Sequence, residues 1–186
     1  MSLKLFRSTG YHSILSPGET RVAMHPGWAV MAASVWIGYA CNPWFWHSLA
    51  AGADVVPATL LGAAVTGATG SVVSLFGWRR TLKPVATVLL AAAALVAAGV
   101  WTQDMALGAA FEGQRPALAL PSWASLFSWQ VPTLLGLLGL LPMLWLWNAQ
   151  LRRLGGPAQL RANLTGMALG ATITGGALLA LPLLTH

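Results

Sequence analysis

The sequence predicts an all-α integral membrane protein with five transmembrane helices, a cytoplasmic N-terminus and a periplasmic C-terminus. Hydrophobic residues make up 56% of the chain and charged residues only 8%, and the mean hydropathy is +0.67. A soluble domain carries roughly 25% charged residues. Long apolar segments fill most of the 186 residues, and nearly all positive charge lies on one side of them.

The distribution of positive charge predicts the orientation. All but one of the Lys and Arg residues lie in the N-terminal tail or in the loops after the second and fourth apolar segments: Lys4, Arg7, Arg21, Arg79, Arg80, Lys83, Arg152, Arg153 and Arg161. Cytoplasmic loops of membrane proteins are enriched in these residues. The net charge of +6 therefore indicates topology and contact with anionic lipid rather than a nucleic-acid partner. A bacterial inner membrane is the predicted location of this multi-pass chain.

The chain begins with a basic cytoplasmic tail, residues 1–26, in which Pro17 and Pro26 interrupt any long helix. This tail lacks the apolar segment and cleavage site of a signal peptide, so the first span is expected to act as an uncleaved insertion signal. That span is predicted at about 27–46. Its length suits a bilayer core of ~30 Å, and its aromatic end suits the membrane–water interface.

Four further spans complete a predicted five-helix domain over residues 27–186, at about 57–78, 84–101, 131–147 and 162–184. Pro84 opens the third span, where a missing N–H is tolerated, and Pro142 predicts a kink in the fourth. Residues 102–130 are predicted to form a periplasmic loop. Gly155, Gly156 and Pro157 are predicted to break the chain before the fifth span.

Two groups of residues are candidate partner-binding sites. Small residues recur at four-residue spacing in the fifth span, at Gly166, Gly170 and Thr174, and such residues allow close approach of helices in lipid. They predict either internal packing or a face for another membrane subunit. The second group lies in the tail, where charged and apolar side chains could contact a partner: Lys4, Phe6, Arg7 and Arg21.

Aromatic and polar residues near predicted span ends form a third candidate group: Asn42, Trp44, Trp46, His47, Trp123 and Trp129. Anchoring at the interface explains such residues, and contact with a lipid, quinone or pigment is the alternative. Cys41 is the single cysteine, and the histidines and acidic residues are scattered. No metal site, catalytic residue or intrinsic cofactor is therefore predicted, although bound lipids are expected.

Two stretches carry a family resemblance. Asn42, Phe45, Trp46 and Leu49 close the first predicted span, and Leu138-Gly139-Leu140-Leu141-Pro142 lies in the fourth. In these stretches and in the order of its spans, the chain resembles the N-terminal membrane domain of the lipid A phosphoethanolamine transferases. The resemblance implies a membrane domain without the catalytic domain that follows it in that family, since this sequence stops where the linker would begin. The loop after Asp104 departs from the family pattern.

Three functions are compatible with these features. The first is a non-catalytic accessory or scaffold subunit of a larger inner-membrane assembly, either a photosynthetic reaction centre–light-harvesting complex or a respiratory complex. The second is a lipid-binding module that works in trans with a phosphoethanolamine transferase and binds phosphatidylethanolamine or lipid A near the 102–130 loop. The third, a small transporter, is disfavoured because no ionisable residue lies in the middle of a predicted span.

Overall fold

The computed structural model describes residues 23–52, 54–78, 80–103, 128–152 and 154–184. Most of the predicted tail and most of the predicted 102–130 loop lie outside these ranges. Within them every regular element is a helix, as predicted. The order along the chain is α1 (Pro26–Val35), the π-helix η3 (Trp36–Ala40), α2 (Pro43–Ala51), α3 (Val55–Leu75), α4 (Leu82–Gln103), α6 (Gln130–Leu134), the π-helix η5 (Leu135–Leu140), α7 (Leu141–Asn148) and α8 (Gly156–Leu184).

Four helical segments in the described ranges are long and apolar enough to cross a membrane: Val55–Leu75, Leu82–Trp101, Gln130–Asn148 and Gly156–Leu183. They correspond to the second, third, fourth and fifth predicted spans. The last of them begins six residues earlier than the predicted 162, because Pro157 does not break the helix. It lies in the first turn of α8, where proline lacks only an N–H that would have no helical partner.

The prediction of one continuous helix over 27–46 is not confirmed. The chain leaves the helix at Cys41 and Asn42, and α2 then begins at Pro43. A residue before proline is disfavoured in the helical conformation, and Asn42 is extended, with φ −104° and ψ 99°. Its side-chain oxygen accepts the Phe45 N–H at 3.2 Å. The Asn-Pro pair therefore ends one helix and caps the next.

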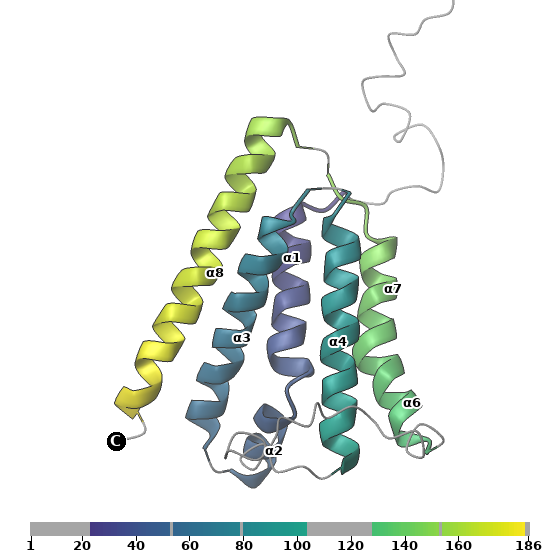
Figure 1. The fold of residues 1–186 in the computed structure, drawn as a ribbon, viewed down its shortest axis with the longest axis vertical. Coiled ribbons are helices and arrows are strands. Elements are labelled where there is room, and N and C mark those ends of the chain that lie inside the picture. The colour runs from purple at the N-terminus through teal and green to yellow at the C-terminus, as the bar shows by residue number, and fades with distance from the viewer. Residues whose placement is uncertain (1–22, 53, 79, 104–127, 153, 185–186) are drawn as a thin grey trace, which may run out of the picture.

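The helices form a bundle in which α3 lies between α8 and α1, and α4 lies between α1 and α7 (Figure 1). The most extensive contact joins α3 and α8. A compact apolar core lies between α1, α3, α4 and α7, built from small and medium side chains: Ala29, Ala33, Val73, Leu82, Ala86, Leu90 and Leu146. In contrast, α8 packs on α3 and scarcely contacts α1.

Pro142 has a structural consequence that differs from a simple kink. It has no N–H to offer the carbonyl of Leu138 four residues earlier, and the preceding segment is the π-helix η5. The Leu138 carbonyl accepts instead the indole N–H of Trp36 at 3.0 Å, and Cys41 Sγ lies 3.8 Å away. An interrupted helix is thus stabilised by a side chain from η3 in the first helical segment.

At the end of the bundle where α1 begins, backbone bonds join distant segments. Met24 N–H donates to the Gln150 carbonyl at 2.8 Å, and Arg152 N–H donates to the Met24 carbonyl at 2.9 Å. Lys83 Nζ donates to the carbonyls of Trp147 and Ala149 at 3.0 and 2.9 Å, at the end of α7. This end also carries the exposed Arg80, Arg152 and Arg161, and we call it the basic end.

Replacing Trp36 with Phe removes the indole donor and retains most of the apolar ring. We expect Trp36→Phe to lower the free energy of unfolding by about 1–2 kcal/mol, because the Leu138 carbonyl loses its partner. Thermal unfolding in detergent measures the change. The Pro142→Ala variant restores a backbone N–H near that carbonyl, so the cost of Trp36→Phe should shrink in the double variant.

Trp28→Phe is the matched control, since Trp28 is 60% exposed at the other end of the same helical segment. Equal stability of Trp36→Phe and Trp28→Phe, or the same Trp36→Phe cost with and without Pro142, would contradict this role of the indole.

Candidate functional site

The contact between α3 and α8 depends on glycine and hydroxyl side chains. A Cβ atom on Gly67 would lie 2.5 Å from the Gly170 carbonyl oxygen, and one on Gly170 would lie 2.5 Å from the Gly67 carbonyl oxygen. Ser71 Oγ donates to the Met167 carbonyl at 3.2 Å, and Thr174 Oγ1 reaches the Ala64 carbonyl at 3.2 Å. Small residues let the backbones approach, and hydroxyls then bond across the contact.

This contact covers the face that was a candidate partner site. Gly170 and Thr174 contact α3 of the same chain, and a Cβ on Gly166 would overlap with Ser74 of α3. These three residues therefore make internal packing contacts, one of the two alternatives that the sequence allowed, and their role as a face for a partner stays a prediction.

A second close contact joins the first helical segment to the same helix α3. A Cβ on Gly38 would overlap with Thr66 and lie 2.5 Å from the Gly62 carbonyl oxygen. Tyr39 Oη donates to the Thr59 carbonyl at 3.2 Å. The first segment is therefore held against α3 at its η3 end, while α8 is held along another part of α3.

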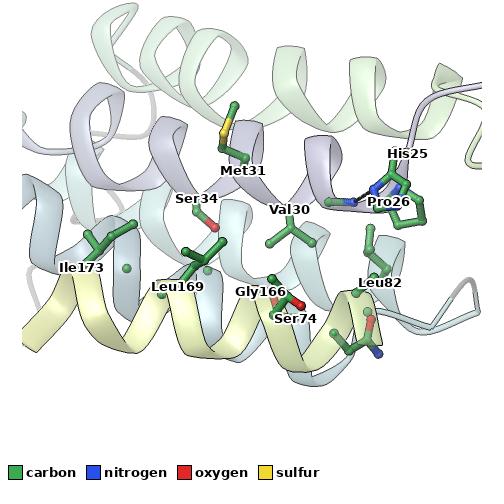
Figure 2. Close-up of a pocket in the computed structure, with 18 of the residues that line it drawn as sticks. His25, Pro26, Val30, Met31, Ser34, Ser74, Leu82, Gly166, Leu169 and Ile173 are labelled. Atoms are coloured by element: carbon green, nitrogen blue, oxygen red, sulfur yellow. Dashed lines mark hydrogen bonds between the residues drawn. The ribbon is translucent and has the colours of Figure 1, made fainter. Parts of the chain in front are cut away.

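The two partners of α3 leave a slot between them that extends toward the basic end. It has a volume of about 450 Å³ and is lined by α1, α3 and α8. Figure 2 shows Val30, Met31 and Ser34 of α1 on one side, and Gly166, Leu169 and Ile173 of α8 on the other. The slot thus lies between α1 and α8, two helices that pack on different parts of α3.

The end of the slot near the start of α1 is polar. His25, Gln159 and Asn163 line it, and the last two are 6% and 7% exposed. Gln159 Nε2 donates to the Gly77 carbonyl at 2.9 Å and to Asn163 Oδ1 at 2.8 Å. His25 Nδ1 accepts the Gly27 N–H at 3.1 Å and thereby caps α1.

Ser34 lies deeper in the slot and is 2% exposed. Among the described side chains, Ser34 Oγ is the one buried polar atom without a hydrogen-bond partner. Other helical hydroxyls in the bundle bond the carbonyl four residues earlier, as Thr66 does with Gly62 at 2.8 Å. Figure 2 shows Ser34 Oγ directed toward the space between α1 and α8. A buried unpaired hydroxyl costs about 1–3 kcal/mol, so this group indicates a missing partner.

The interfacial candidates do not converge on this slot. Asn42 caps α2 and also donates to the Gly38 carbonyl at 3.2 Å, so its bonds are local. Trp46 donates to the Ala40 carbonyl at 3.3 Å and borders an open groove with Trp36, Tyr39 and Phe45. Trp44 is half-buried and His47 is exposed on α2.

Trp129 is 75% exposed before α6. Trp123 and the tail residues lie outside the described ranges, so their candidate roles stay predictions: Lys4, Phe6, Arg7 and Arg21. Among the described residues, no group of three or more His, Cys, Asp or Glu side chains could hold a metal ion.

Sequence analysis missed Ser34, Gly70, Gln159 and Asn163 as parts of a site. One signal was available, because Gln159 and Asn163 lie four residues apart, on one face of a helix, just before a long apolar run. Gly70 and Ser34 gave no such signal, since small residues are common in membrane helices and only the structure shows which of them border a space.

Comparisons of the chain with protein-family models, with curated proteins and with solved structures gave no match. The fold and composition define the class as a helical protein with four apolar helices of membrane-spanning length in its described part.

Replacing Gly170 with Leu places a side chain where the Gly67 carbonyl lies. We expect Gly170→Leu to destabilise the bundle by about 1–3 kcal/mol through overpacking, rather than to act on a partner alone. Thermal unfolding of the purified protein measures the loss. Gly175→Leu is the control, because no atom lies within 4 Å of a Cβ built there. If both variants unfold at the same temperature, α8 is not held on α3 by this contact.

Proposed function

We propose that the chain is a non-catalytic membrane module that binds one amphiphilic molecule in the slot between α1, α3 and α8. One observation carries the proposal, which is the slot itself with a polar end and an apolar length. Its volume of about 450 Å³ falls within the ~300–1,000 Å³ range of ligand sites. Lipid is the ligand that such a shape would meet most often inside a membrane.

The described lining favours a lipid-like molecule over a water-soluble one. Val30, Met31, Leu169 and Ile173 offer an apolar wall, and His25 and Asn163 offer polar groups at one end only. An acyl or isoprenoid chain could lie along the wall while its polar group stays at the basic end. This proposal develops the lipid-binding hypothesis but moves the site. The polar residues of the slot include His25, which precedes α1, and α1 begins at the end of the bundle opposite to where α4 ends and α6 begins (Figure 1).

For the membrane arrangement we propose five crossings in a bacterial inner membrane, with the first made by α1 and η3. The basic end would face the cytoplasm, because Arg80, Arg152 and Arg161 lie there. The described acidic residue Asp54 lies at the other end, before α3. α1 and η3 together are shorter than a full span, and α2 would then lie near the periplasmic interface.

The accessory-subunit hypothesis remains a proposal that rests on sequence alone. Its candidate tail residues lie outside the described ranges, and its candidate face on α8 is covered by α3. The resemblance to phosphoethanolamine transferases likewise supports a partner enzyme in trans only as an expectation. An assembly with light-harvesting or respiratory subunits rests on no contact in the described residues.

Filling the slot should remove its ligand without unfolding the bundle. Gly70 lines the slot, and a Cβ there would lie 3.4 Å from Ser34 Oγ of α1, so a leucine side chain would take up space between α3 and α1. We expect Gly70→Leu to abolish the retained lipid signal in native mass spectrometry of protein released from mild detergent.

Gly176→Leu adds the same side chain to a helical glycine with no atom within 4 Å of its Cβ, and it should retain lipid as the wild type does. Both variants should keep the wild-type helical circular dichroism spectrum. Unchanged lipid retention by folded Gly70→Leu would show that the slot is not the binding site.

The orientation is tested by cysteine labelling in a Cys41→Ala background. A membrane-impermeant thiol reagent added to whole cells should label Glu112→Cys in the periplasm and leave Leu154→Cys unlabelled. After the membrane is permeabilised, Leu154→Cys should react as well, which controls for its access to the reagent. The opposite pattern before permeabilisation would invert the proposed topology.

A further inference from the structure

We infer that the polar end of the slot selects a lipid with an anionic phosphodiester headgroup. This inference rests on the proposed function, because it names the ligand of the same slot. The apolar wall alone gives little selectivity between lipids, because a lipid chain that enters the slot exchanges one apolar environment for another. Discrimination between ligands must come from the polar groups that line the slot.

The first argument comes from the direction of the buried amides. A carbonyl can only accept, so the Gly77 carbonyl requires the amide nitrogen of Gln159 as its donor. The same nitrogen lies 2.8 Å from Asn163, which must therefore present its oxygen there. The amide nitrogen of Asn163 is then left to line the slot as a donor.

The second argument comes from His25. Its Nδ1 accepts the Gly27 N–H, so in the neutral ring the proton lies on Nε2. His25 thus also offers a donor where it lines the slot. Asn163 and His25 thus each offer a donor at the polar end, beside the side-chain oxygen of Gln159, and these donors match the oxygens of a phosphate.

The third argument comes from the surrounding charge. Both α1 and α8 begin at the basic end, so the positive ends of two helix dipoles lie there. Arg80, Arg152 and Arg161 are exposed at the same end, and Asp54, the one acidic residue in the described ranges, precedes α3 at the far end. The local field therefore favours a ligand with net negative charge.

Ser34 adds an independent sign of a ligand. It lies nine residues along the first helical segment from His25, which is roughly 13 Å at the α-helical rise of about 1.5 Å per residue. Its unpartnered hydroxyl is directed into the same slot (Figure 2). A ligand with an oxygen atom at this depth would pair the hydroxyl, whereas the hydrocarbon of an acyl chain would only lie beside it.

The test uses the full chain in nanodiscs with equal amounts of phosphatidylglycerol and phosphatidylcholine, followed by native mass spectrometry. The wild type should retain phosphatidylglycerol with about tenfold preference, because both headgroups offer a phosphodiester to the donors but the cationic choline of phosphatidylcholine is disfavoured at the basic end. Asn163→Asp keeps an oxygen for Gln159 and replaces the donor with a carboxylate oxygen. It should remove the preference while the slot still holds lipid.

Asn148→Asp is the matched control, since it makes the same charge change near the basic end, at the end of α7 and outside the slot lining. It should keep the wild-type preference. If both Asp variants lose the preference for phosphatidylglycerol equally, the added negative charge alone explains the loss, and the role of Asn163 is overturned. Wild-type retention of both lipids in equal amounts would overturn the anionic headgroup.

The experiment distinguishes a wrong headgroup from a wrong binding site. If lipid is retained without preference and Gly70→Leu removes it, the slot is correct and the headgroup inference is wrong. If Gly70→Leu leaves lipid unchanged, the proposed function fails first. Added inorganic phosphate separates a lipid from a free anion: millimolar phosphate should not displace phosphatidylglycerol, and displacement would assign the donors to a soluble anion instead.

Discussion

The slot exists because small residues on two sides of α3 let two neighbouring segments pack close to it. Gly62 and Thr66 hold the η3 segment against it, while Gly67 and Ser71 hold α8. Both neighbours are thus fixed on α3 and scarcely contact each other. In lipid, no hydrophobic force drives α1 and α8 together, so the space between them can persist where only small side chains line α3. The first helical segment and α8 are thus each held close to α3, and the cavity lies between these two neighbours of α3.

In our proposal, the polar network at the basic end gives this cavity its selectivity. The Gly77 carbonyl follows the end of α3, and the amide pair of Gln159 and Asn163 comes from the start of α8. A bulkier residue at Gly77 would collide with Asn163. The end of one helix and the start of another are therefore locked by a buried bond chain, which fixes the direction of the remaining donors.

Much of the fold could be predicted from the sequence, because four apolar runs are long enough to define their helices by length and hydropathy alone. The first predicted span was not confirmed as one continuous helix, because the Asn42-Pro43 pair ends a helix within an otherwise apolar run. The site was harder to predict. Gly166 and Gly170 showed that a close contact exists, but spacing does not name the partner helix, and Ser34 resembles any packed serine until its surroundings are known.

A map of the protein in nanodiscs containing phosphatidylglycerol tests the central claim most directly. Cryo-electron microscopy with a bound antibody fragment for alignment would show the slot. The account predicts elongated density between Met31 and Leu169, with its strongest part beside His25 and Asn163. A slot closed by α8 packed directly on α1, or a slot without ligand density, would contradict it.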